Sequence, residues 1–161
     1  MKKRQQGLTT VEAAIGAALM LLILFATIEI ARVVFVWNFL DEVTRRGARV
    51  AAVCPIFNED AKRAAIFANP KTGTESPHVK NLEPGLISVD YWDKDGNEIE
   101  DADDFAKVRF VRVSVDSFDL PLLVFTGLSV TTPQFTTYLP SESLGYNPDI
   151  VSDPPTFECV F

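Results

Sequence analysis

The stretch GLTTVEAAIGAALMLLILFATI, residues 7–28, decides the fold of this chain, because it is long and apolar enough to cross a membrane. Residues 8–28 carry a single charge, that of Glu12. As a helix with a rise of about 1.5 Å per residue, they span a hydrocarbon core of roughly 30 Å. The basic residues 2–4, KKR, precede this span. Positive flanks stay cytoplasmic, so the sequence predicts that the bulk of the chain lies on the other side of the membrane.

The charge of the 161-residue chain is unevenly distributed. The net charge is −7, but the residues after Gly7 hold 12 basic and 22 acidic side chains, a net charge of −10. Binding to nucleic-acid phosphates needs clustered Lys and Arg, so this acidic exterior argues against a nucleic-acid partner. When the span and its flanks are set aside, about 110 residues remain, enough for one small domain and too few for two.

The helical pattern continues past the span. Apolar or small residues recur at three- and four-residue spacing, the pattern of a helical stripe: Val33, Val36, Leu40, Val43, Gly47, Val50 and Cys54. Glu29 and Arg32 are i, i+3 neighbours that can form an ion pair where the helix leaves the membrane. Pro55 ends the helix, because the residue before proline is disfavoured in helical geometry. We therefore expect one helix from about Leu8 to Val53, whose second half packs its stripe against the domain that follows.

The remainder of the chain predicts a small sheet. Alternating apolar and polar residues indicate strands at residues 86–92, 107–118 and 128–139, with Pro121 ending the second and Pro133 interrupting the third. Asp95, Gly96 and Asn97 form a hairpin-type turn. Asn58 is placed to cap a short helix over residues 59–68. The predicted fold class is α+β, with a long N-terminal helix, transmembrane in its first half and amphipathic in its second, packed on a small antiparallel sheet.

Two residues set the span apart from a plain membrane anchor. Gly7 separates the basic leader from the apolar run, and Glu12 follows five residues later. A carboxylate costs about 2.5–3.5 kcal/mol at the bilayer centre and usually has a partner. Cleavage after Gly7 would release the amine of Leu8, whose ordinary pKa of about 7.7–8.0 keeps it mostly protonated at neutral pH. Glu12 could pair with that amine; alternatively, lying only about 6 Å into the helix, it could reach the headgroups.

Small residues crowd the start of the span. Ala13 and Ala17, like Ala14 and Ala18, are four residues apart, and Gly16 lies between them. Such faces let helix backbones approach closely in a membrane. We expect Glu12, Ala13, Gly16 and Ala17 to form an assembly surface, the alternative being a plain anchor with a few alanines.

The two cysteines, Cys54 and Cys159, lie far apart in the sequence. No CxxC or Cys/His spacing occurs and His78 is the only histidine, which excludes a metal site built from soft ligands. If the chain is exported, an even cysteine count favours one disulfide, which would tie the end of the long helix to the chain terminus. Two separate buried thiols are the alternative.

The sequence contains few candidates for catalysis. It has no GxSxG, no Gly-rich phosphate loop and no HExxH, and His78 lies in a Pro/Gly-rich loop. We therefore expect no enzymatic activity and no cofactor. Asp93, Asp95 and Asp101 are calcium candidates, but Gly96 stands at the fourth position of DKDG, where an EF-hand loop needs glycine at the sixth. A solvated turn between two strands is the preferred interpretation.

The glycine-ended leader, the carboxylate at the fifth position after it and the long helix together resemble a type IV prepilin. Residues 11–53 are further similar to the TadE-like family of minor pilins (pseudopilins) of tight-adherence pili. That family shows a Val-Glu start, an apolar core, a Glu-x-x-Arg exit and an Arg-Gly-Ala-Arg helix end. The corresponding residues here are Val11 and Glu12, Glu29 and Arg32, and residues 46–49. Residues 135–145, FTTYLPSESLG, are also similar to the family's C-terminal strand.

The resemblance implies a division of the chain into four parts. Residues 1–7 are a leader that prepilin peptidase removes between Gly7 and Leu8, and residues 8–30 are a transmembrane and assembly helix. Residues 31–54 continue this helix in amphipathic form, and residues 55–161 form a small periplasmic or extracellular α+β domain. The family's major pilin is very short, so a chain of this length suits a minor subunit. The tail with Cys159 is longer than is typical of the family.

The functional expectation is a minor pilin that supports pilus biogenesis and surface adhesion. Its partners would be prepilin peptidase and the other pilin subunits of the same pilus. It would lie in the inner membrane with its C-terminal domain in the periplasm, and then move to the pilus at the cell surface. The alternative is a permanently anchored periplasmic binding module or enzyme, with residues 1–30 as an uncleaved signal anchor. A secreted domain with a conventional signal peptide is a third interpretation, which the long apolar run disfavours.

Overall fold

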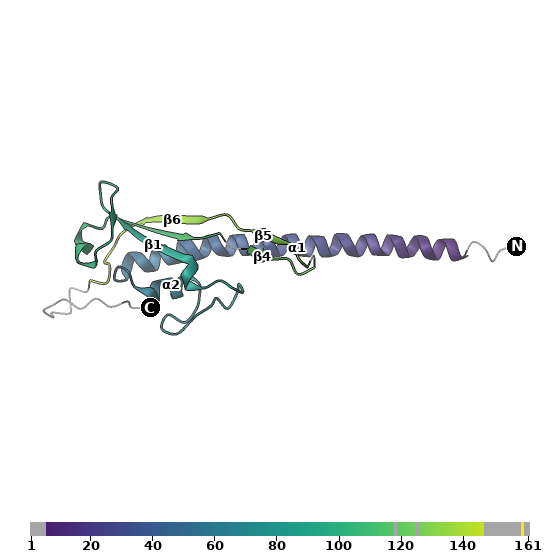
Figure 1. Ribbon diagram of the computed structural model, residues 1–161, viewed down its shortest axis with the longest axis horizontal. Helices are drawn as coiled ribbons and strands as arrows, with labels where there is room; N and C mark the ends of the chain where they lie inside the picture. The colour runs from purple at the N-terminus through teal and green to yellow at the C-terminus, as the bar shows by residue number, and fades with distance from the viewer. Residues whose placement is uncertain (1–5, 118, 125, 147–158, 160–161) are drawn as a thin grey trace. The chain divides into compact units, whose positions relative to one another are not determined.

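A computed structural model of the chain describes residues 6–117, 119–124, 126–146 and 159. Helix α1 runs without interruption over Gln6–Val53, as the sequence predicted (Figure 1). The chain divides into two compact units. The first comprises Met1–Val36 with Asp119–Thr131, and the second comprises Trp37–Phe118 with Thr132–Phe161.

The second unit is built on a four-stranded antiparallel sheet. Its strand order is β2-β1-β3-β6, with bounds β1 Ile87–Trp92, β2 Glu98–Ile99, β3 Phe110–Val115 and β6 Phe135–Pro140. Strand β3 is central, since its Val115 lies opposite Ile87 of β1 on one side and opposite Phe135 of β6 on the other. Val111, Val113 and Val115 of β3 are fully buried, which is the two-residue period of a sheet with one face on the core.

The C-terminal half of α1 packs on this sheet through the predicted stripe. Leu40, Val43 and Gly47 are buried. A Cβ atom at Gly47 would lie 3.0 Å from Ala65 Cβ and 3.1 Å from Val113 Cγ1, so glycine is what allows this close approach. Thr44 Oγ1 lies 2.9 Å from Thr137 Oγ1, which links the helix to β6 by a hydrogen bond. The α+β fold, with a long helix packed on a small antiparallel sheet, is therefore confirmed.

Helix α2 is shorter than predicted. It covers Glu59–Ala65, and Asn58 is its N-cap as expected, with Oδ1 accepting a hydrogen bond from the Asp60 amide at 2.8 Å. The helix ends early because Phe67 has a positive φ of 62°. Arg46 of α1 contacts this ending, since its Nε donates to the Ala64 carbonyl at 2.8 Å and its guanidinium lies 4.3 Å from the centre of the Phe67 ring.

The strand predictions need two corrections. Strand β3 begins at Phe110, because the 3-10 helix η2, Ala102–Lys107, occupies the start of the predicted strand. Pro121 does not simply break a strand: it is the last residue of β4, Asp119–Pro121, which pairs with β5, Ser129–Thr131, in a separate hairpin of the first unit. Proline is tolerated there because β4 is an edge strand. The interruption at Pro133 is confirmed, since it separates β5 from β6.

The segment after β6 returns to the end of α1. The amides of Glu142 and Leu144 donate to the Ala52 carbonyl at 3.0 and 3.3 Å, and the Gly145 amide donates to the Val53 carbonyl at 2.6 Å. The last carbonyls of a helix lack hydrogen-bond donors within the helix, and the backbone amides of this segment act as the donors. Cys54 and Cys159 form a disulfide at the same place, as the sequence predicted for an exported chain.

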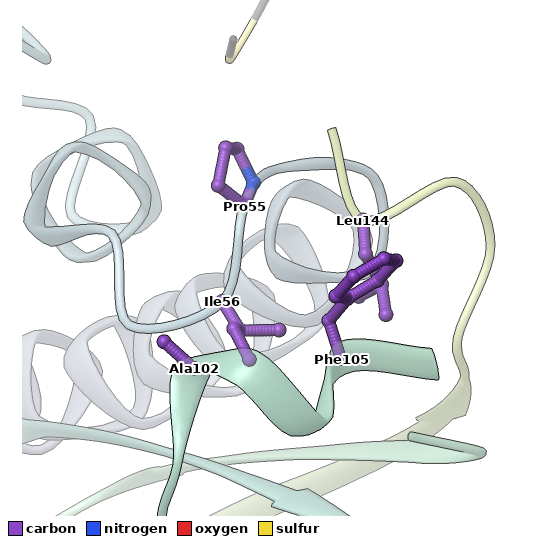
Figure 2. A pocket seen from close by; sticks show the side chains of 5 residues that line it. All are labelled: Pro55, Ile56, Ala102, Phe105 and Leu144. Carbon is purple, nitrogen blue, oxygen red and sulfur yellow. The ribbon is translucent and has the colours of Figure 1, made fainter. Parts of the chain in front are cut away.

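A short 3-10 helix, η1, covers Pro84–Leu86 and leads into β1. A small apolar cavity of about 110 Å³ lies near the end of α1, and Figure 2 shows its lining side chains: Pro55, Ile56, Ala102, Phe105 and Leu144. Among the described residues that line it, no side chain carries a polar group, so no side chain there could orient a polar ligand.

Candidate functional site

The N-terminal half of α1 exposes its apolar side chains. Leu8, Met20 and Ile23 keep 73%, 70% and 65% of their surface accessible. The helix segment Leu8–Val53 contains a window with a mean hydropathy of 2.4, and only 11% of that window is buried. A core helix of a soluble protein passes the same hydropathy test but is mostly buried. This helix is therefore able to span a membrane by its length and composition, and its apolar surface is open to lipid or to other helices.

The residues expected at the processing and assembly site all lie on this open helix. Gly7 and Leu8 are in its first turn, and Glu12, Ala13 and Ala17 are exposed. A Cβ atom at Gly16 would meet no described atom within 4 Å. Side chains four residues apart share a helix face, so Leu8, Glu12 and Gly16 form one row and Ala13 and Ala17 the next. The described chain brings no second segment to this surface, so a second helix packed on it would come from another molecule.

The most elaborate polar site directly follows the apolar run. Glu29 is only 4% exposed, and its Oε1 lies 3.2 Å from Arg32 Nη1. The ion pair predicted from i, i+3 spacing is thus present, while its place at a membrane exit stays a prediction. Arg32 also donates to the Pro121 carbonyl at 2.8 Å.

The β4–β5 hairpin supplies the other partners of Glu29. Its carboxylate accepts the amide of Leu123 at 2.8 Å and that of Val124 at 3.4 Å. The sequence alone does not indicate this contact, because the donors are backbone amides that belong to no motif and lie more than 90 residues from Glu29. The absence of charge from residues 120–141 was the signal that could have drawn attention to the hairpin.

The acidic turn is organised by its own hydrogen bonds. Asp93 Oδ1 accepts the amides of Asp95 at 2.8 Å and Asn97 at 2.9 Å, and Asn97 Nδ2 donates to Asp93 Oδ2 at 3.1 Å. These bonds, with the Asn97 amide first, lower the pKa of Asp93 below its ordinary value. Within the part of the chain that the structure describes, no group of three or more His, Cys, Asp or Glu side chains is placed to hold a metal ion. The three calcium candidates, which include Asp101, therefore gain no support from the geometry.

His78 lies in an exposed loop, as expected, but it also has a packing role. Its ring centre is 5.5 Å from that of Phe39 and 5.8 Å from that of Phe67. These edge contacts attach the loop to α1 and to the end of α2.

Fold and site together define a class of protein: a small antiparallel-sheet domain carried on a long helix whose exposed apolar half is able to span a membrane. The comparison with protein families is consistent with that class, since the family model described as TadE-like protein matches residues 7–49. This match contains Gly7, Glu12 and the Glu29–Arg32 pair, and it confirms the resemblance drawn from the sequence. No curated protein and no solved structure matches the chain. TadE-like proteins are structural components associated with tight-adherence pili and are not known as enzymes.

Proposed function

We propose that this protein is a minor pilin (pseudopilin) of a tight-adherence pilus. The observation that carries the proposal is the TadE-like match over residues 7–49, which falls on the helix that leaves its apolar side chains and Glu12 exposed. Residues 1–7 would be the leader, residues 8–30 the transmembrane and assembly helix, and residues 31–54 its amphipathic continuation. Residues 55–161 would form the outward-facing domain, with no catalytic activity.

Processing would prepare the helix for assembly. Prepilin peptidase would hydrolyse the peptide bond between Gly7 and Leu8 on the cytoplasmic side: the C–N bond breaks, the oxygen of water joins the Gly7 carbonyl carbon to form the carboxylate, and the Leu8 nitrogen takes up a proton to become the new amine. Glu12 lies one turn from Leu8 along the same face. An ammonium and a carboxylate about 4 Å apart attract by about 4 kcal/mol at an effective dielectric constant of about 20. This attraction would make pairing between neighbouring subunits strong enough to fix their axial register.

Assembly would then bury the exposed helix among other pilin helices. Ala13, Gly16 and Ala17 would allow close backbone approach, as small residues do in membrane helix pairs. Before assembly, the subunit would reside in the inner membrane with its sheet domain in the periplasm. It would then enter the pilus at the cell surface. Its direct partners would be the peptidase and the other pilins.

The test is cleavage in cells that also express the matching prepilin peptidase. We expect the wild-type chain to lose residues 1–7, and a Gly7→Val variant to remain at full length because the branched side chain replaces the glycine at the cleaved bond. Gly85→Val is the matched control, since a Cβ at Gly85 meets no described atom within 4 Å. Cleavage of Gly7→Val at the same rate as the control would contradict the proposed site. A wild-type chain that keeps Met1 would instead support a permanently anchored protein.

A further inference from the structure

We propose that the β4–β5 hairpin, Asp119–Thr131, is a second membrane-contacting element. Its apolar tip would enter the interface of the bilayer beside the exit of α1, and Glu29 would make this possible by accepting hydrogen bonds from the backbone of the tip. The proposal needs only the membrane span of α1, so it holds whether or not the chain is processed and assembled into a pilus.

The hairpin lies beside α1 in the first unit, and its contacts give it a direction (Figure 1). The Pro121 carbonyl accepts from Arg32, whereas the amides of Leu123 and Val124 donate to Glu29, nearly one helical turn closer to the apolar span. The chain therefore advances towards the span as it leaves β4. The described residues of the tip, 122–124 and 126–128, lie at the level where a helix spanning with residues 8–28 would leave the bilayer.

The tip is apolar and exposed. Leu123 and Leu128 keep 67% and 62% of their surface accessible, and Val124 keeps 41%. Between Asp119 and Glu142 the sequence contains no charged residue, although 23% of the whole chain is charged. Adjacent exposed apolar side chains mark an interaction surface, and here the surface continues that of the membrane helix.

Glu29 solves the problem that such a tip meets in lipid. Backbone amides have no water partner in a bilayer, so each must be paired within the protein. Glu29 accepts two of them, and the Leu122 amide donates to the Leu128 carbonyl at 3.0 Å. Arg32 offsets the buried charge of Glu29, which would be costly without a partner.

A lipid surface fits these features better than a neighbouring subunit does. The tip contains no charged group that would select a protein partner, and it is attached to the part of α1 that must sit in the membrane before any assembly. A subunit that covers the tip only in a pilus is the competing explanation, and the experiment separates the two.

The experiment places a fluorescent probe at the tip of the full-length, uncleaved protein. Cys54 and Cys159 are bonded to each other, so an added cysteine at Leu123→Cys can be labelled selectively with an environment-sensitive nitrobenzoxadiazole dye. Ile23→Cys, 65% exposed in the span, is the inserted reference, and Tyr138→Cys, 61% exposed on β6, is the aqueous reference. The proteins are reconstituted into phosphatidylcholine and phosphatidylglycerol vesicles that contain lipids with a doxyl quencher near the headgroups.

We expect the probe at position 123 to emit at shorter wavelength and to be quenched at least about twofold more than the probe at position 138. Adding Glu29→Gln should reduce this quenching towards that of the aqueous reference, because an amide oxygen replaces only one of the two accepting oxygens. The Ile23→Cys probe, measured in the Glu29→Gln background, reports whether the helix is still inserted. With the helix inserted, unchanged tip quenching in Glu29→Gln would overturn the role of Glu29.

A tip probe that is as exposed to water as the probe at position 138 would overturn the proposal. A tip that becomes protected only in assembled pili would also overturn it and would assign the surface to a neighbouring subunit. The vesicle result does not depend on whether the chain is a pilin, because the vesicles contain unprocessed protein and no peptidase.

Discussion

Three glycine-to-alanine substitutions separate the cost of backbone strain from the cost of steric overlap in the free energy of unfolding. The overlap concerns Gly145, which packs at the end of α1. Gly145 has a φ of +79°, and a Cβ there would lie 2.7 Å from Pro55 Cγ and 2.8 Å from Pro55 Cδ. Gly96 has a similar φ of +81° but open space around its Cβ, and Gly85 has neither constraint. The three positions form a graded series in which one factor is added at each step.

The expected losses follow from these two factors. Left-handed backbone costs a residue with a side chain about 1–2 kcal/mol, so Gly96→Ala should lower the free energy of unfolding by about that amount. Gly145→Ala adds an overlap with the rigid ring of Pro55, for which overpacking costs about 1–3 kcal/mol more. The total expected loss in the free energy of unfolding for Gly145→Ala is therefore about 2–5 kcal/mol. Gly85→Ala should change this free energy by less than about 0.5 kcal/mol.

The assay is denaturant unfolding of the full-length protein in detergent under oxidising conditions, followed by near-ultraviolet circular dichroism. Oxidising conditions keep the Cys54–Cys159 disulfide intact in every variant, so that the chain tether is constant. We expect the denaturant midpoint to be highest for Gly85→Ala, lower for Gly96→Ala and lowest for Gly145→Ala. Equal midpoints for Gly96→Ala and Gly145→Ala would refute the close packing of the returning segment on the helix end.

Three further predictions concern the core and the assembly surface. Burial raises the pKa of Tyr91 to about 12. The stability that Tyr91 contributes should therefore be complete below pH 10 and should fall by about 3 kcal/mol as the pH rises from about 10 to about 12. Unfolding measured as a function of pH checks this, and the loss should be absent in Tyr91→Phe. Gly47→Leu should destabilise by about 3 kcal/mol or more, because even its Cβ would be 3.0 Å from Ala65. Gly47→Ala should cost less, since alanine recovers about 1 kcal/mol of helix propensity; equal losses would contradict the packing argument. Glu12→Ala should leave processing largely intact but reduce surface piliation as counted by electron microscopy, and normal pilus numbers would count against the register role of Glu12.

The sequence predicted the elements that local patterns control. The helix to Val53 followed from the apolar stripe and Pro55, and the N-cap at Asn58 and the turn at Gly96 followed from single residues with strong preferences. The end of α2 could not be predicted in this way. It is held by a tertiary contact, in which Arg46 of another helix meets Ala64 and Phe67.

The candidate site shows the same limit. The i, i+3 spacing identified Glu29 and Arg32, because both partners lie on one helix. The amides of Leu123 and Val124 carry no side-chain signal, so only the folded chain shows that they complete the site. The partner proposed for Glu12 lies on another molecule or on an amine that exists only after cleavage, so neither the sequence nor a single folded chain contains it.

We propose that residues 8–53 form a processed pilin-type helix, and the N-terminal sequence of the subunit in sheared, purified pili would test this proposal without an intermediate step. We expect a chain that begins at Leu8, with Glu12 as its fifth residue. Absence of the subunit from the pili, or a subunit in them whose sequence begins at Met1 or well after residue 30, would contradict this assignment.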